Sequence, residues 1–175
     1  MRALRRILGV EGEPRSDAND TATVRRIAAE LEALPPAEAR FLAAFAYVLA
    51  RVARADLEIS SDESEKMVAL LRACSSLSEA QALLVVQMAK TSAIALGGTE
   101  NYLVTRQFKE ISTPAQRVEL LRCLFAVAGA DTSISHVENT EITTIGMELG
   151  FGGEEVASVR AAFRDQLSVL KPLAR

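Results

Sequence analysis

The chain has 175 residues, of which 49% are hydrophobic, and carries a formal net charge of −3. This length and apolar content suit one folded domain with a substantial core and argue against a disordered chain. The small negative charge gives no support to nucleic-acid binding through phosphate neutralisation, and no apolar run reaches the roughly 20 residues of a membrane-spanning helix. We therefore expect a cytoplasmic protein without a transmembrane segment.

The N-terminal residues 1–23 combine glycine, proline and a polar run, and we interpret them as a flexible lead-in. Arginines beside apolar residues leave a second interpretation open, a short amphipathic arm for peripheral association with a membrane or another surface. The remaining residues 24–170 are expected to form a single domain. The arginines of the lead-in are Arg2, Arg5 and Arg6.

Apolar residues recur at helical spacing along this domain and predict an all-α, compact bundle of about seven or eight helices. A first helix is expected over Ala22–Leu34 and is ended by Pro35 and Pro36. Pro36 then suits the first turn of a second helix, which carries Phe41–Val52. A helix from Ser78 to about Leu96 is nearly apolar at its centre, which predicts the most buried element. A further helix over Thr99–Ile111 precedes three more, one on each side of the second turn and a last one after Gly150, which is a helix stop. The helical stripes include Phe45, Val48, Leu49, Met67, Leu70, Leu71, Leu120, Leu124, Ile142, Ile145, Val156 and Phe163.

One stretch of the sequence occurs twice. Leu49–Met67 and Leu124–Ile142, offset by 75 residues, agree at 8 of 19 positions. Chance would give about one or two matches, so the two stretches form an internal repeat. Each copy predicts the end of an apolar helix, a tight acidic turn whose isoleucine (Ile59 or Ile134) enters the core, and the capped start of another helix. We therefore expect a fold built on an internal duplication.

The repeated pattern V-A-x-A-D-x-x-I-S-x-x-E resembles that of the TerB-like family, named after bacterial tellurite-resistance proteins. Related domains also stand at the front of some membrane-anchored J-domain co-chaperones. The resemblance covers about Ala37 to Phe163. It implies an all-helical interaction module in a bacterial stress or tellurite-resistance system that works near the inner membrane.

The two turns contain the candidate site, which consists of Asp56, Glu63, Asp131 and Glu138. If the duplication brings the turns together, these carboxylates would suit a hard divalent cation such as Ca²⁺, Mg²⁺ or Mn²⁺. A structural interpretation stands beside this one, because each glutamate follows a serine by three residues and so completes a helix capping box. The aspartates can likewise accept hydrogen bonds from free turn amides. The serines are Ser60 and Ser135.

Other reactive residues are few. The two cysteines, Cys74 and Cys123, align with apolar positions of the other copy, which predicts two small core residues. The single histidine, His136, is expected on the surface at a helix start. A zinc site of cysteine and histidine ligands, or catalysis by a histidine base, therefore has little support.

Four arginines, Arg25, Arg26, Arg51 and Arg54, are interpreted as solvated helix surface, with no interleaved aromatic residues for nucleic-acid stacking. The leading hypothesis is a non-enzymatic module that binds a protein partner. The alternative is a divalent-metal-binding protein that uses the two acidic turns. A hydrolase with paired carboxylates is a third hypothesis, which needs a pocket that raises the pKa of one carboxyl. Assembly into a homo-oligomer remains open.

Overall fold

The structure, a computed structural model, describes residues 17–52, 61–92, 98–130 and 133–166. These ranges form eight α-helices and one short 3₁₀ helix, and they contain no β-strand. The predicted all-α class is confirmed, whereas the duplication stays a prediction. The helices are α2 (Asp17–Glu32), α3 (Pro36–Val52), α4 (Ser61–Cys74), α5 (Glu79–Ser92), α6 (Gly98–Ile111), α7 (Pro114–Ala128), α8 (His136–Glu148), α9 (Gly153–Ala161) and η2 (Arg164–Gln166).

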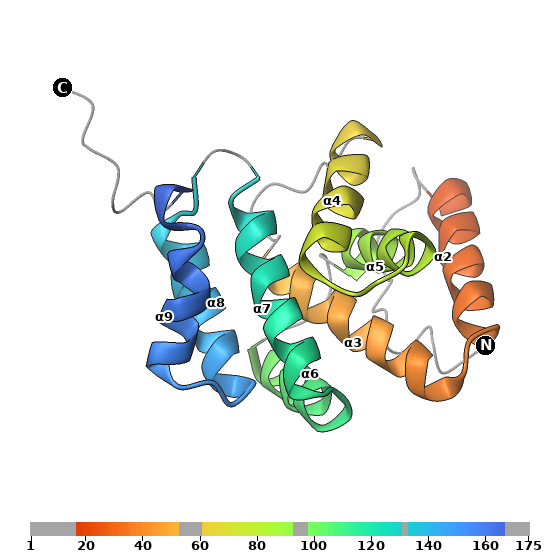
Figure 1. Ribbon diagram of the computed structural model, residues 1–175. Coiled ribbons are helices and arrows are strands. Elements are labelled where there is room, and N and C mark those ends of the chain that lie inside the picture. Colours follow the sequence, from red (N-terminus) through yellow and green to blue (C-terminus); the bar gives the residue numbers. More distant parts are fainter. Residues whose placement is uncertain (1–16, 53–60, 93–97, 131–132, 167–175) are drawn as a thin grey trace.

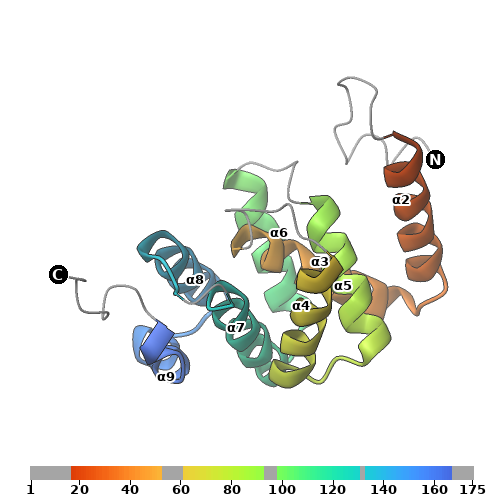
Figure 2. The same ribbon diagram turned by 90° about the horizontal axis from the view of Figure 1, so that it is seen from above.

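Helix α3 runs through the middle of the bundle, with α2 and α9 at opposite ends of the molecule in both views (Figures 1 and 2). It packs against α2, α5, α6, α7 and α8. Its alanines Ala44, Ala46 and Ala50 are buried and keep the helix narrow, so several neighbours can approach it closely. We expected the helix beginning near Ser78 to lie at the centre of the bundle; α3 takes this place, whereas α5 packs against α2, α3 and α4 and leaves Leu83 45% exposed.

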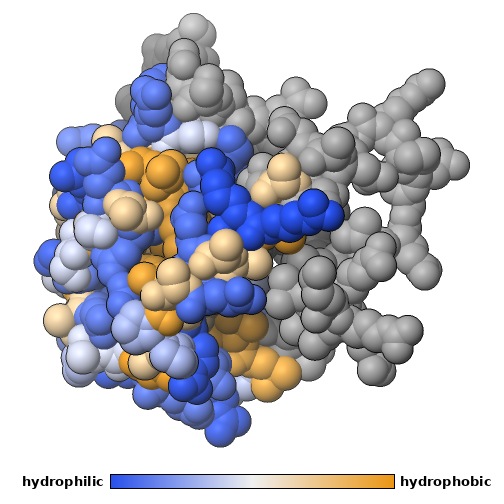
Figure 3. Space-filling model, turned by 90° about the vertical axis from the view of Figure 1, so that its right-hand side faces the viewer, coloured by the Kyte–Doolittle hydropathy of each residue, from blue (hydrophilic) through white to orange (hydrophobic). Residues whose placement is uncertain are grey.

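Helix α2 lies at the edge of the bundle and starts at Asp17, inside the polar run that we expected to belong to the lead-in. It buries Ile27 and exposes Arg25 and Arg26, as the solvated-surface interpretation predicted. Hydrophilic side chains cover much of the face that carries α2 (Figure 3). The next helix begins at Pro36, as predicted, because proline fits the first turn of a helix, where no backbone donor is needed.

The helices on either side of the first turn bury apolar stripes close to those predicted. On α4, Met67 and Leu71 are buried, whereas Leu70 is only partly buried. On α3, Phe45, Val48, Leu49 and Val52 are buried, and Phe41 packs at the margin of the core. The 3.6-residue period therefore identified the inward face of each helix, and Leu70 lies at the border of that face.

The end of α8 is shaped by Gly150, which has a φ of 94°. In this left-handed conformation, which favours glycine, Gly150 N–H donates to Met147 O and Phe151 N–H donates to Gly146 O, at 2.9 and 3.0 Å. These bonds satisfy the last carbonyls of the helix and turn the chain toward α9. The predicted helix stop is confirmed.

Candidate functional site

Of the four predicted site residues, only Glu138 has a described side chain. Asp56, Asp131 and the side chain of Glu63 lie outside the described part of the chain. Glu138 accepts a hydrogen bond from Ser135 N–H at 2.7 Å, and its own N–H donates to Ser135 Oγ at 3.2 Å. This reciprocal pair is the capping box predicted at the start of α8. The carboxylate of Glu138 is therefore engaged with the helix N-terminus.

The turn that precedes α8 is held from the core side as well. Ile134 is 1% exposed and belongs to the main apolar core, as predicted, while its counterpart Ile59 lies outside the described ranges. His136 is exposed at the first position of α8, also as predicted. The cap and the buried isoleucine together fix where α8 begins.

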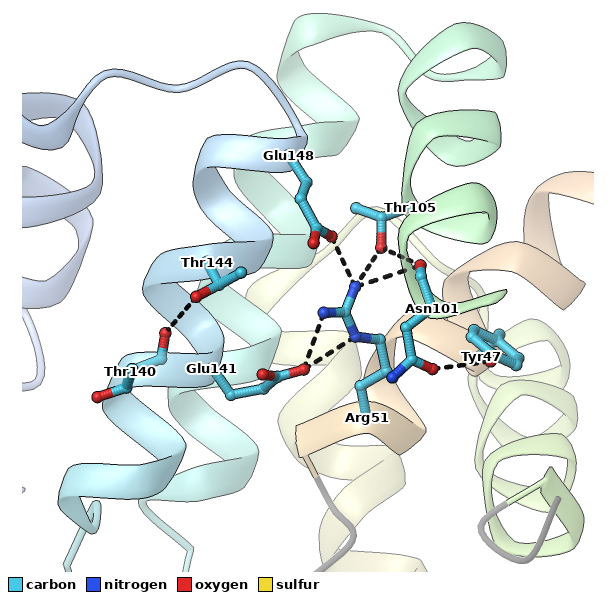
Figure 4. A network of polar contacts seen from close by, with 8 residues as sticks. All are labelled: Tyr47, Arg51, Asn101, Thr105, Thr140, Glu141, Thr144 and Glu148. Carbon is cyan, nitrogen blue, oxygen red and sulfur yellow. Dashed lines mark hydrogen bonds and ion pairs between the residues drawn. The ribbon is translucent and has the colours of Figure 1, made fainter. Parts of the chain in front are cut away.

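A buried polar network lies next to this region and is centred on Arg51, in the last turn of α3 (Figure 4). Two guanidinium nitrogens contact the same Oε1 atom of Glu141 on α8, Nε at 3.0 Å and Nη2 at 2.8 Å. Its Nη1 lies 2.7 Å from Oε2 of Glu148, at the end of the same helix. Arg51 is only 7% exposed, so its charge is balanced inside the protein by these two carboxylates.

Helix α6 supplies the other partners of the network. Arg51 Nη1 also donates to the carbonyl oxygen of Asn101, at 3.3 Å, and to Oγ1 of Thr105. The Thr105 hydroxyl donates to the Asn101 carbonyl at 3.0 Å, and the Tyr47 hydroxyl of α3 donates to Asn101 Oδ1 at 2.9 Å. Asn101 and Thr105 are both buried. The network thus joins α3, α6 and α8 through groups that satisfy one another, as buried polar groups require.

The charge balance of this network defines what it can do. One guanidinium faces two carboxylates, and the side chains of Glu141 and Glu148 remain 34% and 15% exposed. Breaking a buried ion pair on one side leaves an uncompensated charge, which costs far more than an exposed pair is worth. Arg51, Glu141, Glu148, Asn101 and Thr105 therefore fix three helices relative to one another, and we call this network the clamp. The exposed parts of the two glutamates leave negative charge on the surface of α8.

The clamp corrects the sequence-based interpretation of Arg51 as solvated surface. The prediction failed because it considered the arginines by their spacing from one another and not by their position on the apolar stripe. Arg51 follows Ala44 and Val48 by seven and three residues, which places it on the inward face of α3. A charged residue at such a position signals a buried partner. Arg54, the fourth arginine of that group, lies outside the described ranges.

The two cysteines differ in burial. Cys123 is fully buried on α7, which confirms the core prediction, whereas Cys74 at the end of α4 is partly exposed. Among the described residues, no three histidine, cysteine, aspartate or glutamate side chains are grouped as ligands for a metal ion. Within the same ranges, no helix is long and apolar enough to cross a bilayer.

The described part of the chain is thus a small all-helical protein in which a buried arginine joins helices α3, α6 and α8. The chain matches the family model described as tellurite resistance protein TerB over residues 41–161. This match covers more than half of the chain, so the protein belongs to the TerB family. It includes Arg51, Glu141, Glu148 and both acidic turns. No curated protein and no solved structure shows significant similarity to the chain.

Proposed function

We propose that this protein is a non-enzymatic interaction module that uses its two acidic turns to bind a protein partner. The partner belongs to a bacterial stress or tellurite-resistance system on the cytoplasmic side of the inner membrane. Membership of the TerB family supports this setting. Peripheral contact with the membrane through the N-terminal arginines, and self-association, are compatible with this role.

The observation that carries the proposal is the bond between Arg51 and Glu141. Arg51 stands one residue before the end of α3, which leads into residues 53–60, and Glu141 lies on the helix that follows the second turn. Glu141 is five residues from the start of α8, or about 7.5 Å along the helix axis. The clamp therefore holds the end of α3 and the first half of α8, which border the two acidic segments, next to each other. Because the helices beside the two segments are already fixed, less conformational entropy is lost when a partner binds there.

Electrostatics supports a protein partner with a basic surface. The first segment carries Asp56 and Glu58, and the second carries Asp131. The exposed parts of Glu141 and Glu148 extend this negative charge along α8. Charge complementarity of this kind speeds association and selects partners more than it raises affinity. Binding should therefore weaken as ionic strength rises.

The test compares three forms of the immobilised protein as baits for a bacterial membrane extract. The turn variant is Asp56→Asn/Glu58→Gln/Asp131→Asn, and the matched control variant is Glu79→Gln/Glu110→Gln/Glu154→Gln. Both lose three negative charges, and circular dichroism checks that both keep the helical fold. We expect a salt-sensitive partner that the wild type and the control variant retain and the turn variant releases. Equal retention by all three forms would contradict a role for the turns.

Binding of a divalent cation by the same turns remains the second candidate. The clamp supports this candidate, because it joins α3 and α8, the helices that border the two acidic segments. Hard cations bind such carboxylate oxygens, with Ca²⁺, Mg²⁺ and Mn²⁺ as the candidates. A cation that binds only the folded state raises the melting temperature by mass action, which separates this candidate from the first.

A further inference from the structure

The only two cysteines of the chain meet between α4 and α7. Cys74 is the last residue of α4 and Cys123 lies in the middle of α7. Cys74 follows Leu71 by three residues on the same side of α4, packs against the core and interacts with the Cys123 side chain. The same Cys123 Sγ lies 4.0 Å from the carbonyl oxygen of Leu71, one turn before Cys74, so it is docked against the end of α4. One sulfur is buried and the other reaches solvent.

The surroundings give the two thiols opposite acidities. The interaction with Cys123 is the main cause that lowers the pKa of Cys74 to about 7, with Arg122 also lowering it and burial opposing. The same interaction, together with burial and the charge of Cys74, raises the pKa of Cys123. Near neutral pH the partly exposed Cys74 is therefore in good part a thiolate, the reactive form, while Cys123 stays protonated.

We propose that Cys74 and Cys123 form a hydroperoxide-sensitive dithiol, in which Cys74 reacts first and Cys123 closes an intramolecular disulfide between α4 and α7. The site is independent of the partner-binding role of the acidic turns. Its substrate class is hydrogen peroxide or a small organic hydroperoxide, which reaches Cys74 from solvent. A buried sulfur in contact with the attacking one is the arrangement that a resolving cysteine requires.

The reaction balances in two steps. The Cys74 thiolate attacks the terminal oxygen of the hydroperoxide, the O–O bond breaks, and Cys74 becomes a sulfenic acid. The leaving alkoxide or hydroxide takes a proton from solvent and becomes an alcohol or water. The Cys123 sulfur then attacks the Cys74 sulfur, the S–O bond breaks, and the hydroxyl leaves as water with the Cys123 proton. Two thiols lose two electrons in total, and the hydroperoxide gains them. Conversion of Cys74 to a neutral sulfenic acid removes the negative charge that helped keep Cys123 protonated.

The disulfide would connect the two halves of the bundle. Helix α4 follows the first acidic turn and α7 precedes the second. The bond closes a loop over residues 74–123, which restricts the unfolded chain and raises the melting temperature. Oxidation would thus add a covalent link between α4 and α7, beside the ion pairs and hydrogen bonds by which Arg51 joins α3, α6 and α8.

The test treats the reduced full-length protein with hydrogen peroxide, blocks free thiols with N-ethylmaleimide and weighs the intact chain. We expect a monomer that has lost two hydrogen atoms, carries no maleimide and melts at a higher temperature. Dithiothreitol should restore two reactive thiols. Cys123→Ala should instead stop at a Cys74 sulfenic acid that dimedone traps, and Cys74→Ser should give neither product. A disulfide that forms only between two chains, or a Cys74 that oxidises while Cys123 stays free, would overturn the proposal.

A pH profile provides a second readout that does not depend on peroxide. The rate of maleimide addition to Cys74 should rise with a midpoint near pH 7 in the wild type. In Cys123→Ala the midpoint should move up toward the ordinary thiol value of about 8.5, because the interaction with Cys123 is lost while Arg122 remains. Ser75 and Glu119 act on Cys123 and so drop out of this comparison. A midpoint that Cys123→Ala leaves unchanged would show that the two sulfurs are not in contact.

Discussion

Arg51 and Glu141 are 90 residues apart in the chain, yet the guanidinium of the first holds one carboxylate oxygen of the second through two nitrogens, at 3.0 and 2.8 Å. The contact joins the last turn of α3, within the first repeat stretch, to the first half of α8, within the second. Since Glu148 binds the same guanidinium from the end of α8, the two helices are fixed at two points. This relationship organises both the fold around the turns and the proposed function.

Removing the centre of the clamp should be strongly destabilising. Arg51→Ala leaves two carboxylates and the buried Thr105 hydroxyl without their donor, and we expect a loss of about 3–5 kcal/mol in the free energy of unfolding. Urea denaturation measures it. The matched control is Arg72→Ala, since Arg72 pairs with Glu79 in solvent at 3.0 Å and should cost about 0–1 kcal/mol. Equal losses in the two variants would show that Arg51 is not a buried clamp.

The cap of α8 offers a smaller and more local effect. Ser135→Ala removes the oxygen that accepts from Glu138 N–H and should cost about 0.5–2 kcal/mol in thermal or urea unfolding. Thr140→Ala is the control, because the exposed Thr140 hydroxyl donates only to the His136 carbonyl of its own helix, at 2.8 Å. Ser60→Ala should match Ser135→Ala if the first turn is capped in the same way. A Ser135→Ala protein as stable as the control would contradict the cap.

Truncation of two leucines should distinguish a core position from one at the border of the core. Leu124 is fully buried on α7, and Leu124→Ala should cost about 2–5 kcal/mol. The sequence placed Leu70 on an equally buried stripe, but its side chain is only partly buried, so Leu70→Ala should cost clearly less. The ratio of the two losses in urea unfolding checks the assignment of the α4 face. A larger loss for Leu70→Ala would restore the original interpretation.

Close packing of α8 on α9 depends on a missing side chain. A Cβ added to Gly146 would lie 2.7 Å from Cγ2 of Val156, which is too close for two carbon atoms that are not bonded to each other. Gly146→Ala should therefore cost about 1–3 kcal/mol through overpacking. The double variant with Val156→Ala should lose less than the sum of the two single variants, because the smaller side chain makes room for the new methyl group. If the stability losses of the two single variants simply add in the double variant, the predicted clash between the new methyl group and Val156 does not occur.

Local patterns in the sequence were enough to predict most of the helices. The 3.6-residue apolar period located α3, α4, α7 and α8, and the S-x-x-E pattern predicted the cap that Ser135 and Glu138 form. Such features depend on neighbours within one or two turns of the same helix, so the letters alone determine them. The family resemblance rested on the same repeated letters, and the match over residues 41–161 confirms it.

Features that depend on distant neighbours were missed. Arg51 meets partners 90 and 97 residues away, and the contact between Cys74 and Cys123 arises only when α4 packs on α7. The prediction that α5, and not α3, lies at the centre failed for the same reason. An apolar run indicates burial but does not show how many helices surround it. Pair contacts of this kind are set by the packing of whole helices, which no local pattern encodes.

The most direct test of the central claim, a protein-binding role without a bound metal, is a thermal melt of metal-stripped protein with Ca²⁺, Mg²⁺ or Mn²⁺ added. The melt is repeated with Asp56→Asn/Asp131→Asn. We predict that no cation raises the melting temperature of the wild type, because the turns act as caps and as a binding surface for a protein. A rise that is specific to one cation and absent from the double variant would contradict this account and make the acidic turns a metal site.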